Sequence, residues 1–288
     1  MSRVRVVVSG YTSVDTRLVT SALPRAGETA LLDGEVLPPP RWGGCAPNIA
    51  LWLERLGVHA ALVAWLGDDE EGRLYRSLLE DAGVDLRALE VGTGPSARAW
   101  LVHDAGGEAI CLFHPAGSEA QGAAAAAPLA EEAEWLAVTV GPPRLTSSLL
   151  DRFESTPLAW NVKADRQAFT PALVARLATA AVVSFNRSET VFLGDALALR
   201  RPAEPDDLLE RGAGLVALTR GREGALLAWS DGRVELAQDA IPVSDATGAG
   251  DAFFAGLLAA LVEGATPADA GRRGIETASH HLQAGRAL

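Results

Sequence analysis

Short apolar runs alternate with stretches of helical spacing along most of the chain. Val4–Ser9 is an apolar, β-branched run that ends at Gly10, which predicts a buried strand. From Asn48 the apolar spacing becomes helical, and Gly57 ends that pattern. Further strands are predicted at Ala60–Leu66, Trp135–Val140, Leu158–Asn161, Val182–Phe185 and Gly214–Thr219. This alternation favours an α/β fold with a mostly parallel central sheet and helices on both faces.

Two segments interrupt the alternation. Residues 11–42 contain short alternating pieces broken by prolines and glycines, which fit small strands and turns. Ala99–Asp104 and Glu108–His114 flank a glycine turn, a pattern typical of a β-hairpin. We expect these two segments, about 11–42 and 96–115, to form one small accessory sheet. Because no long linker and no internal repeat is present, residues 1–288 are predicted to be a single domain.

The composition narrows the class of protein. Hydrophobic residues make up 48% and charged residues 22% of the 288 positions, so the chain can bury a full core and is not disordered. The longest apolar run, Ala252–Val262, is shorter than the roughly 18 residues of a membrane span. The N-terminus lacks the features of a signal peptide, so we expect a soluble, cytoplasmic protein. Cys45 and Cys111 are too few for a disulfide framework or a four-ligand zinc site.

The net charge and the lysine content argue against two classes of protein, those that bind nucleic acid and those with a P-loop. Lys and Arg number 25 against 37 Asp and Glu, a net charge of −12, which disfavours nucleic-acid binding. Lys163 is the only lysine, so no P-loop is present, because that loop requires a lysine directly after its second glycine. A bound polyphosphate would have to be neutralised by backbone N–H groups, metal ions and arginines.

The motif Asp245-Ala-Thr-Gly-Ala-Gly-Asp251 carries the sharpest local signal. Gly248 and Gly250 turn the chain into a long apolar helix predicted to start near Ala249. The unpaired N–H groups at such a helix start bind anions. Asp251 would repel a bound phosphate, unless it faces a second ligand and accepts a proton from a hydroxyl that attacks the phosphate. The alternative is an ordinary helix start, with the acidic side chain favouring the helix dipole.

Two further patches add to this motif. Gly43 and Gly44 permit a close approach of ligand to backbone, and Asn48 offers both a donor and an acceptor, although it could simply cap a helix. Asn186 and Glu189 follow a predicted strand and share one helical face at the edge where α/β sheets bind ligands. The alternative there is a capping box.

In this order and spacing, the three patches resemble the PfkB family of carbohydrate kinases, which includes ribokinase and adenosine kinase. The resemblance covers nearly the whole chain, from Gly10 to Asp251 and beyond. It implies a ribokinase-like α/β fold with a small β-sheet lid, which the two accessory segments would form. It also implies ATP-dependent transfer of the γ-phosphate to a hydroxymethyl group of a small sugar, sugar acid or nucleoside, and a homodimer paired through the lid.

The resemblance assigns roles to single residues. Asp251 would be the catalytic base. The anion hole for the γ-phosphate would involve Gly248, Ala249 and Gly250. The substrate would be bound by Asp15, Gly43, Gly44 and Asn48. The nucleotide would be bound by Asn186, Thr219, Gly221 and Gly224. Glu189 would hold Mg²⁺ through water, and Asp245 and Thr247 match a monovalent-cation site, for K⁺, that occurs in some members.

The sequence also departs from the family pattern and leaves alternatives open. Cys45 stands where ribokinase and the sugar-phosphate kinases of the family usually carry lysine, so a phosphorylated sugar would need arginines. The candidates are Arg25, Arg41, Arg98 and Arg144, and Arg98 is the first choice for a substrate carboxylate. Trp42 could stack on a base or sugar, or pack within the lid. A sugar-phosphate kinase and a catalytically silent binding protein remain alternatives. A dinucleotide-dependent oxidoreductase would need a Gly-x-Gly-x-x-Gly turn after the first strand, which is absent.

Overall fold

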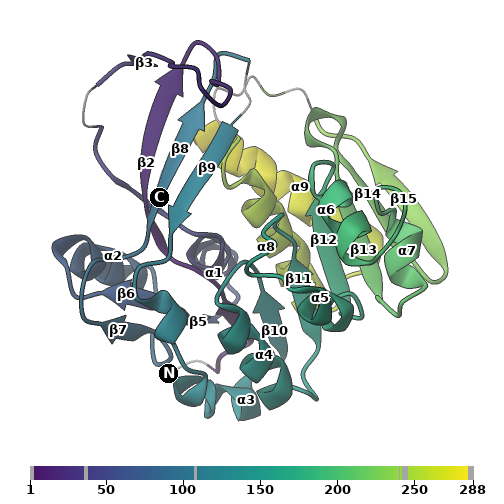
Figure 1. Cartoon of the computed structure of the whole chain (residues 1–288). Coiled ribbons are helices and arrows are strands. Elements are labelled where there is room, and N and C mark those ends of the chain that lie inside the picture. Colours follow the sequence, from purple (N-terminus) through teal and green to yellow (C-terminus); the bar gives the residue numbers. More distant parts are fainter. Residues whose placement is uncertain (1–2, 36–37, 107–108, 240, 242–245, 285–288) are drawn as a thin grey trace.

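The structure is a computed structural model that describes residues 3–35, 38–106, 109–239, 241 and 246–284 (Figure 1). Its main sheet has eight strands in the order β15-β14-β13-β12-β11-β10-β1-β5. These strands are β1 (Val6–Ser9), β5 (Ala60–Val63), β10 (Trp135–Val138), β11 (Leu158–Asn161), β12 (Val182–Asn186), β13 (Leu215–Thr219), β14 (Ala225–Trp229) and β15 (Gly232–Leu236). The strands from β5 to β13 pair in parallel, and β14 and β15 form an antiparallel edge. The predicted α/β class is confirmed.

Helices cover both faces of the main sheet. One face carries α1 (Cys45–Arg55), α2 (Glu70–Asp81), α8 (Ala249–Val262) and α9 (Pro267–Ala284). The other carries α3 (Leu129–Glu132), α4 (Pro143–Arg152), α5 (Pro171–Leu177), α6 (Glu189–Ala196) and α7 (Pro205–Leu209). Short 3₁₀ turns occur at η1 (Ser118–Ala120), η2 (Ala124–Ala126) and η3 (Gly221–Glu223). Successive strand residues such as Val7 and Val8 alternate between the two cores, because side chains in a strand point to opposite faces.

A second, smaller sheet contains the two segments that interrupt the alternation. Its strands are β2 (Ser13–Thr20), β3 (Leu32–Asp33), β4 (Arg41–Gly43), β8 (Arg98–His103) and β9 (Ala109–His114). The β2–β8 pair is parallel, and the other pairs are antiparallel. Figure 1 shows β2, β8 and β9 standing out from the β5 side of the main sheet. The expected accessory sheet, about 11–42 and 96–115, is therefore present.

The strand predicted at Ala60–Leu66 divides in two. β5 belongs to the main sheet, whereas β6 (Trp65–Gly67) pairs with β7 (Glu90–Gly92) in a separate two-stranded sheet. The division occurs at Ala64, whose carbonyl oxygen accepts from the Glu90 N–H at 2.9 Å and from Gln121 Nε2 at 2.7 Å. The sequence does not reveal this break, because β5 and β6 are both buried and their residues form one continuous apolar run.

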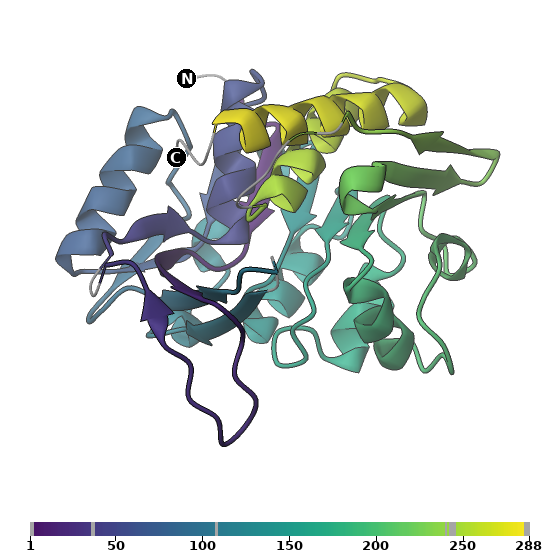
Figure 2. The same cartoon turned by 90° about the horizontal axis from the view of Figure 1, so that it is seen from above.

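Helix α8 is buried on nearly all sides. Every residue from Asp251 to Ala260 is buried, which matches a helix without a polar face. It contacts α1 and α9, and Figure 2 shows α9 lying across it on the outside of the molecule. Thr266 caps α9 through its Oγ1, which accepts from the Asp269 N–H at 3.2 Å, as the sequence predicts.

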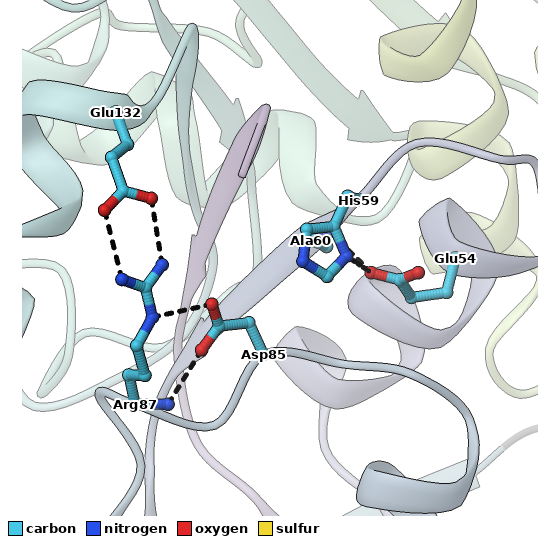
Figure 3. Close-up of polar contacts among 6 residues, drawn as sticks. All are labelled: Glu54, His59, Ala60, Asp85, Arg87 and Glu132. Atoms are coloured by element: carbon cyan, nitrogen blue, oxygen red, sulfur yellow. Dashed lines mark hydrogen bonds and ion pairs between the residues drawn. The ribbon is translucent and has the colours of Figure 1, made fainter. Parts of the chain in front are cut away.

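Polar contacts fasten the opposite end of the sheet, where the strands begin (Figure 3). Glu54 accepts from the Ala60 N–H at 2.6 Å and contacts His59 Nδ1 at 2.8 Å, which ties the end of α1 to the start of β5. Arg87 donates to Asp85 and, through two nitrogens, to Glu132 of α3. Hydrogen bonds and the ion pairs of Arg87 thus hold the end at which the strands begin. Among the described residues, no helix has the length and apolar character needed to cross a membrane.

Candidate active site

The sequence motifs converge at the carboxyl ends of the parallel strands. A cavity of about 760 Å³ opens there between the small sheet, the loops after β12 and β13, and the start of α8. Four predicted nucleotide-binding residues line this cavity: Asn186, Thr219, Gly221 and Gly224. Thr247, Ala249 and Gly250 line it as well. The edge is the one at which α/β sheets bind ligands.

The start of α8 depends on a left-handed glycine. Gly248 precedes the helix with φ 86°, a conformation that favours glycine, and a Cβ there would lie 3.0 Å from the His281 ring. His281 is buried and its Nε2 lies 2.8 Å from the Thr247 carbonyl oxygen, whereas His280 is exposed, in line with the prediction that one of the two is a surface residue. The Ala249 N–H donates to the Ala246 carbonyl at 3.1 Å. The N–H groups of the next residues then stand at the positive end of the helix.

Asp251 is held by three donors from two other segments, helix α1 and the end of β11 with the loop that follows it. Its side chain is 4% exposed; Oδ1 accepts from Asn161 Nδ2 at 3.0 Å, and Oδ2 accepts from Asn48 Nδ2 at 3.1 Å. Lys163 Nζ lies 3.4 Å from Oδ1. The Lys163 side chain is 29% exposed, so this ion pair is accessible to solvent from the lysine side. Asn161 and Lys163 are partners that the sequence analysis missed.

The predicted substrate-binding residues also lie together. Asp15 is buried, and its Oδ1 accepts from Ser13 Oγ at 2.5 Å. A Cβ on Gly43 would overlap the Asp15 carboxylate, so that position requires glycine. Gly44 follows directly and precedes α1, which carries Asn48 in its first turn. The structure therefore brings Asp15, Gly43, Gly44 and Asn48 to one region beside Asp251.

Arg98, predicted to bind a substrate carboxylate, and Trp42, left open between stacking on the substrate and packing within the lid, both contact protein groups. The Arg98 guanidinium lies 3.1 Å from Glu71 Oε1 and 3.9 Å from Asp69 Oδ2, and Arg98 is not among the residues that line the cavity. Trp42 stacks on Tyr75 with ring centroids 5.2 Å apart. Two arginines do line the cavity, Arg17 on β2 and Arg222 after β13, and the sequence analysis singled out neither.

Asn186 and Glu189 form the reciprocal pair of a capping box. The Asn186 N–H donates to Glu189 Oε2 at 2.8 Å, and the Glu189 N–H donates to Asn186 Oδ1 at 3.1 Å. Glu189 is nevertheless buried, and burial, with repulsion from the Asp251 carboxylate, raises the pKa of Glu189 to about 7 against the opposing effects of Lys163 and Asn186. Glu189 can therefore take part in the capping box through Oε2 and still be the residue predicted to hold a metal ion through water.

The residues present fit a magnesium ion that arrives with a nucleotide. No group of three or more His, Cys, Asp or Glu side chains within the described parts of the chain is arranged to hold a metal ion. Mg²⁺ commonly keeps several waters and binds through one or two carboxylates plus substrate phosphates, so it needs no such group. Glu189, a buried carboxyl group beside the cavity-lining Asn186, suits that mode. Asp245 of the expected monovalent-cation site lies outside the described residues.

Comparison with known proteins agrees with this geometry. Residues 5–287 match the pfkB family carbohydrate kinase description. The chain is 28% identical over 243 residues to a nucleoside kinase of Methanothermobacter thermautotrophicus, an alignment covering 82% of this chain and 77% of the relative. It is 30% identical over 259 residues to a fructokinase of Rhizobium leguminosarum bv. trifolii, covering 83% and 76%.

Solved structures show the same fold. The nucleoside kinase of Burkholderia thailandensis, solved with inosine, superposes with a TM-score of 0.83 at 23% identity, covering 96% of this chain and 90% of that one. Because the family match spans almost all residues, the ribokinase-like fold expected from the motifs is confirmed. The chain belongs to the PfkB family of carbohydrate kinases, ATP-dependent phosphotransferases that act on an alcohol group of a sugar or nucleoside.

Proposed function

We propose that this kinase transfers the γ-phosphate of ATP to a hydroxymethyl group of a small sugar or nucleoside, with Asp251 as the base. The observation that carries the proposal is the fixed Asp251 carboxylate at the start of α8, beside a cavity lined by the predicted nucleotide-binding residues. Asp251 would accept the proton of the attacking hydroxyl. The N–H groups at the start of α8 would stabilise charge on the transferred group, a contribution of about 10²–10³ in rate per donor.

Two regions suit the two substrates. Asn186, Thr219, Gly221 and Gly224 line the cavity and would contact the nucleotide. Asp15 and Asn48 are not among the lining residues; they lie on the side of Asp251 and would bind hydroxyls of the acceptor. Magnesium would supply charge neutralisation to the phosphates, with Glu189 and Asn186 holding its water ligands. The monovalent cation stays a proposal that rests on Thr247 and Asp245 alone.

An unphosphorylated acceptor is favoured over a sugar phosphate or a sugar acid. Arg98, the residue expected to meet a substrate anion, is paired with Glu71. Arg25, Arg41 and Arg144 are exposed. Among relatives, a nucleoside kinase and a fructokinase are named for unphosphorylated substrates, whereas a ribose-1-phosphate kinase, 29% identical over 276 residues, is named for a phosphorylated one. The choice therefore rests on the pairing of Arg98.

The two faces of the small sheet suggest a lid that also pairs two copies of the chain. Side chains alternate across a sheet, so Arg17 and Val19 lie on the face of Asp15, toward the cavity. The opposite, outer face carries the exposed apolar residues Leu32, Trp100, Ile110 and Leu112, with exposures of 38 to 58%. A continuous apolar face of this kind marks an interaction surface, and a second copy of the same sheet is the occupant we propose.

The proposal is tested by ADP release with ribose, fructose, 2-keto-3-deoxygluconate, adenosine, cytidine and sugar phosphates as acceptors. We expect one unphosphorylated sugar or nucleoside to drive ADP release far above the rate without acceptor. Release with sugar phosphates alone would establish the sugar-phosphate kinase alternative. ATP binding without acceptor-driven release would establish the silent binding protein.

A further inference from the structure

We propose that Lys163 is a catalytic residue that contacts the transferred phosphoryl group, an inference that rests on the proposed function. Lys163 is the only lysine among 288 residues. It follows Asn161, the last residue of β11, and so stands at the carboxyl edge of the main sheet. Its ammonium group lies beside the base in the first turn of α8.

Two distances place the ammonium group where the phosphoryl group would pass. Nζ lies 3.4 Å from Asp251 Oδ1. It also lies 4.0 Å from the position that a Cβ would take on Gly250, a residue that lines the cavity. A phosphoryl group seated on the N–H groups at this helix start would therefore lie within reach of Nζ, while its acceptor hydroxyl faces Asp251.

The charge of the site gives Lys163 a specific task, which is to offset negative charge beside Asp251. Asp251 and Glu189 are both buried carboxyl groups, and a triphosphate would add further negative charge. Burial opposes the charge on the Lys163 ammonium, but attraction to the carboxylates of Asp251 and Glu189 exceeds that opposition and raises its pKa. The side chain is thus cationic at neutral pH and able to bind phosphate.

A role limited to holding Asp251 is the competing explanation, and it makes a different prediction. The two asparagines already fix both oxygens of the carboxylate. A counter-ion that serves Asp251 alone would be indifferent to the presence of a γ-phosphate. A phosphoryl contact would respond to the γ-phosphate and not to ADP.

The single lysine allows a direct test by reductive methylation of the intact protein, since the α-amino group is the only other primary amine. The reaction is run at pH 9, because only the neutral amine reacts and its fraction grows with pH. The Lys163-containing peptide is followed by mass spectrometry with ADP or with β,γ-imido-ATP, each with Mg²⁺. At about 100 times its Kd, the imido analogue should slow methylation of Lys163 by up to about 100-fold, whereas ADP should slow it far less. Equal slowing by both nucleotides, or by neither, would overturn the proposal.

Substitutions of Lys163 provide a second test of the proposal. In Lys163→Met, the affinity for the imido analogue relative to ADP should fall by about 10- to 100-fold, the effect of losing one charge-assisted hydrogen bond. Lys163→Arg should restore part of that ratio. The matched control is Arg166→Met, because Arg166 lies on the same loop and pairs with exposed Asp195 away from the cavity. Its nucleotide affinities should equal those of the wild type.

The outcomes separate this inference from the proposed function. An unchanged affinity ratio in Lys163→Met, together with reduced activity, would limit Lys163 to holding Asp251 in place and would overturn this inference. Wild-type protein that binds neither nucleotide would overturn the proposed function and this inference together. Wild-type protein that binds both, with no preferential protection of Lys163, would overturn this inference alone.

Discussion

Asn48 and Asn161 donate to opposite oxygens of one buried carboxylate, that of Asp251, from the first turn of α1 and the end of β11. Two amide donors from separate elements restrict both the position and the rotation of the carboxylate. A base that is fixed before the substrate arrives needs no reorganisation during the reaction, which is the condition for efficient proton transfer. The pair of asparagines thus prepares Asp251 for the role we propose.

Asp251→Asn should lower kcat by about 10² to 10⁴ while leaving the nucleotide affinity largely intact, because the variant loses a positioned base but keeps the shape of the site. Steady-state kinetics and calorimetric binding of ADP measure the two effects. Thermal unfolding is the control, since the substitution leaves Lys163 without its carboxylate partner. Wild-type turnover in this variant would remove Asp251 from the role of base.

Glu189→Gln should stabilise the folded protein at pH 8 and weaken magnesium-dependent ATP binding. The folded-state pKa of about 7 exceeds the ordinary 4.5, so the native state favours the neutral acid, and Glu189 reduces stability increasingly as the pH rises from about 4.5 through 7. A glutamine removes this penalty, up to about 3 kcal/mol, and still accepts from the Asn186 N–H.

Urea unfolding at pH 5 and pH 8 measures this effect. Asp195→Asn is the matched control, since Asp195 lies on the same helix but is exposed. A Glu189→Gln variant that is no more stable than wild type at pH 8 would contradict the raised pKa.

Asp69→Asn should destabilise the junction between α2 and the small sheet. Asp69 accepts from the N–H groups of Gly72 and Ser96 and from Ser96 Oγ, at 2.7 to 2.8 Å. Burial works against its charge, but these hydrogen bonds outweigh burial and lower the pKa of Asp69. An asparagine cannot accept all three, so the free energy of unfolding should fall by about 1–3 kcal/mol at pH 7.

The pH dependence has a definite sign. A lowered carboxyl pKa contributes stability that is present above the ordinary value of 3.8 and disappears as the pH falls through the folded-state pKa. The difference between wild type and Asp69→Asn should therefore shrink below pH 3.8. Glu70→Gln, at an exposed neighbouring carboxyl, should show no such change. A pH-independent difference would show that the carboxylate charge is not the cause.

Leu112→Glu should prevent pairing through the outer face of the small sheet. Leu112 is 58% exposed and lies opposite Trp100 in the β8–β9 register, so a buried carboxylate would be placed in the centre of the proposed interface. Sedimentation velocity should find a dimer for the wild type and a monomer for the variant. Leu74→Glu, at a similarly exposed residue of α2, should stay dimeric. A monomeric wild type would refute this interface.

The sequence predicted those features that depend on neighbouring residues. The parallel strands were predicted because each is a short apolar run, and the start of α8 because its glycines and Asp251 lie within one motif. Helix α1 begins at Cys45, three residues before the start that the apolar spacing predicts. Pro47 is tolerated in a first helical turn, and the apolar spacing that revealed the helix begins only after this proline.

Contacts between distant segments could not be predicted in the same way. Nothing local to Asn161 or Lys163 indicates Asp251, although a sole lysine just after a predicted strand was an available signal. The pairing of Arg98 with Glu71 also depends on how β8 packs beside α2, which no spacing reveals.

The burial of α8 has a consequence for motion. Because its apolar surface is enclosed, opening it would expose the centre of the core, and its amide protons should be among the last to exchange with deuterated solvent. The strands of the small sheet, with β9 mostly exposed, should exchange much earlier. When an acceptor molecule enters, the small sheet would then move while α8 and Asp251 stay in place.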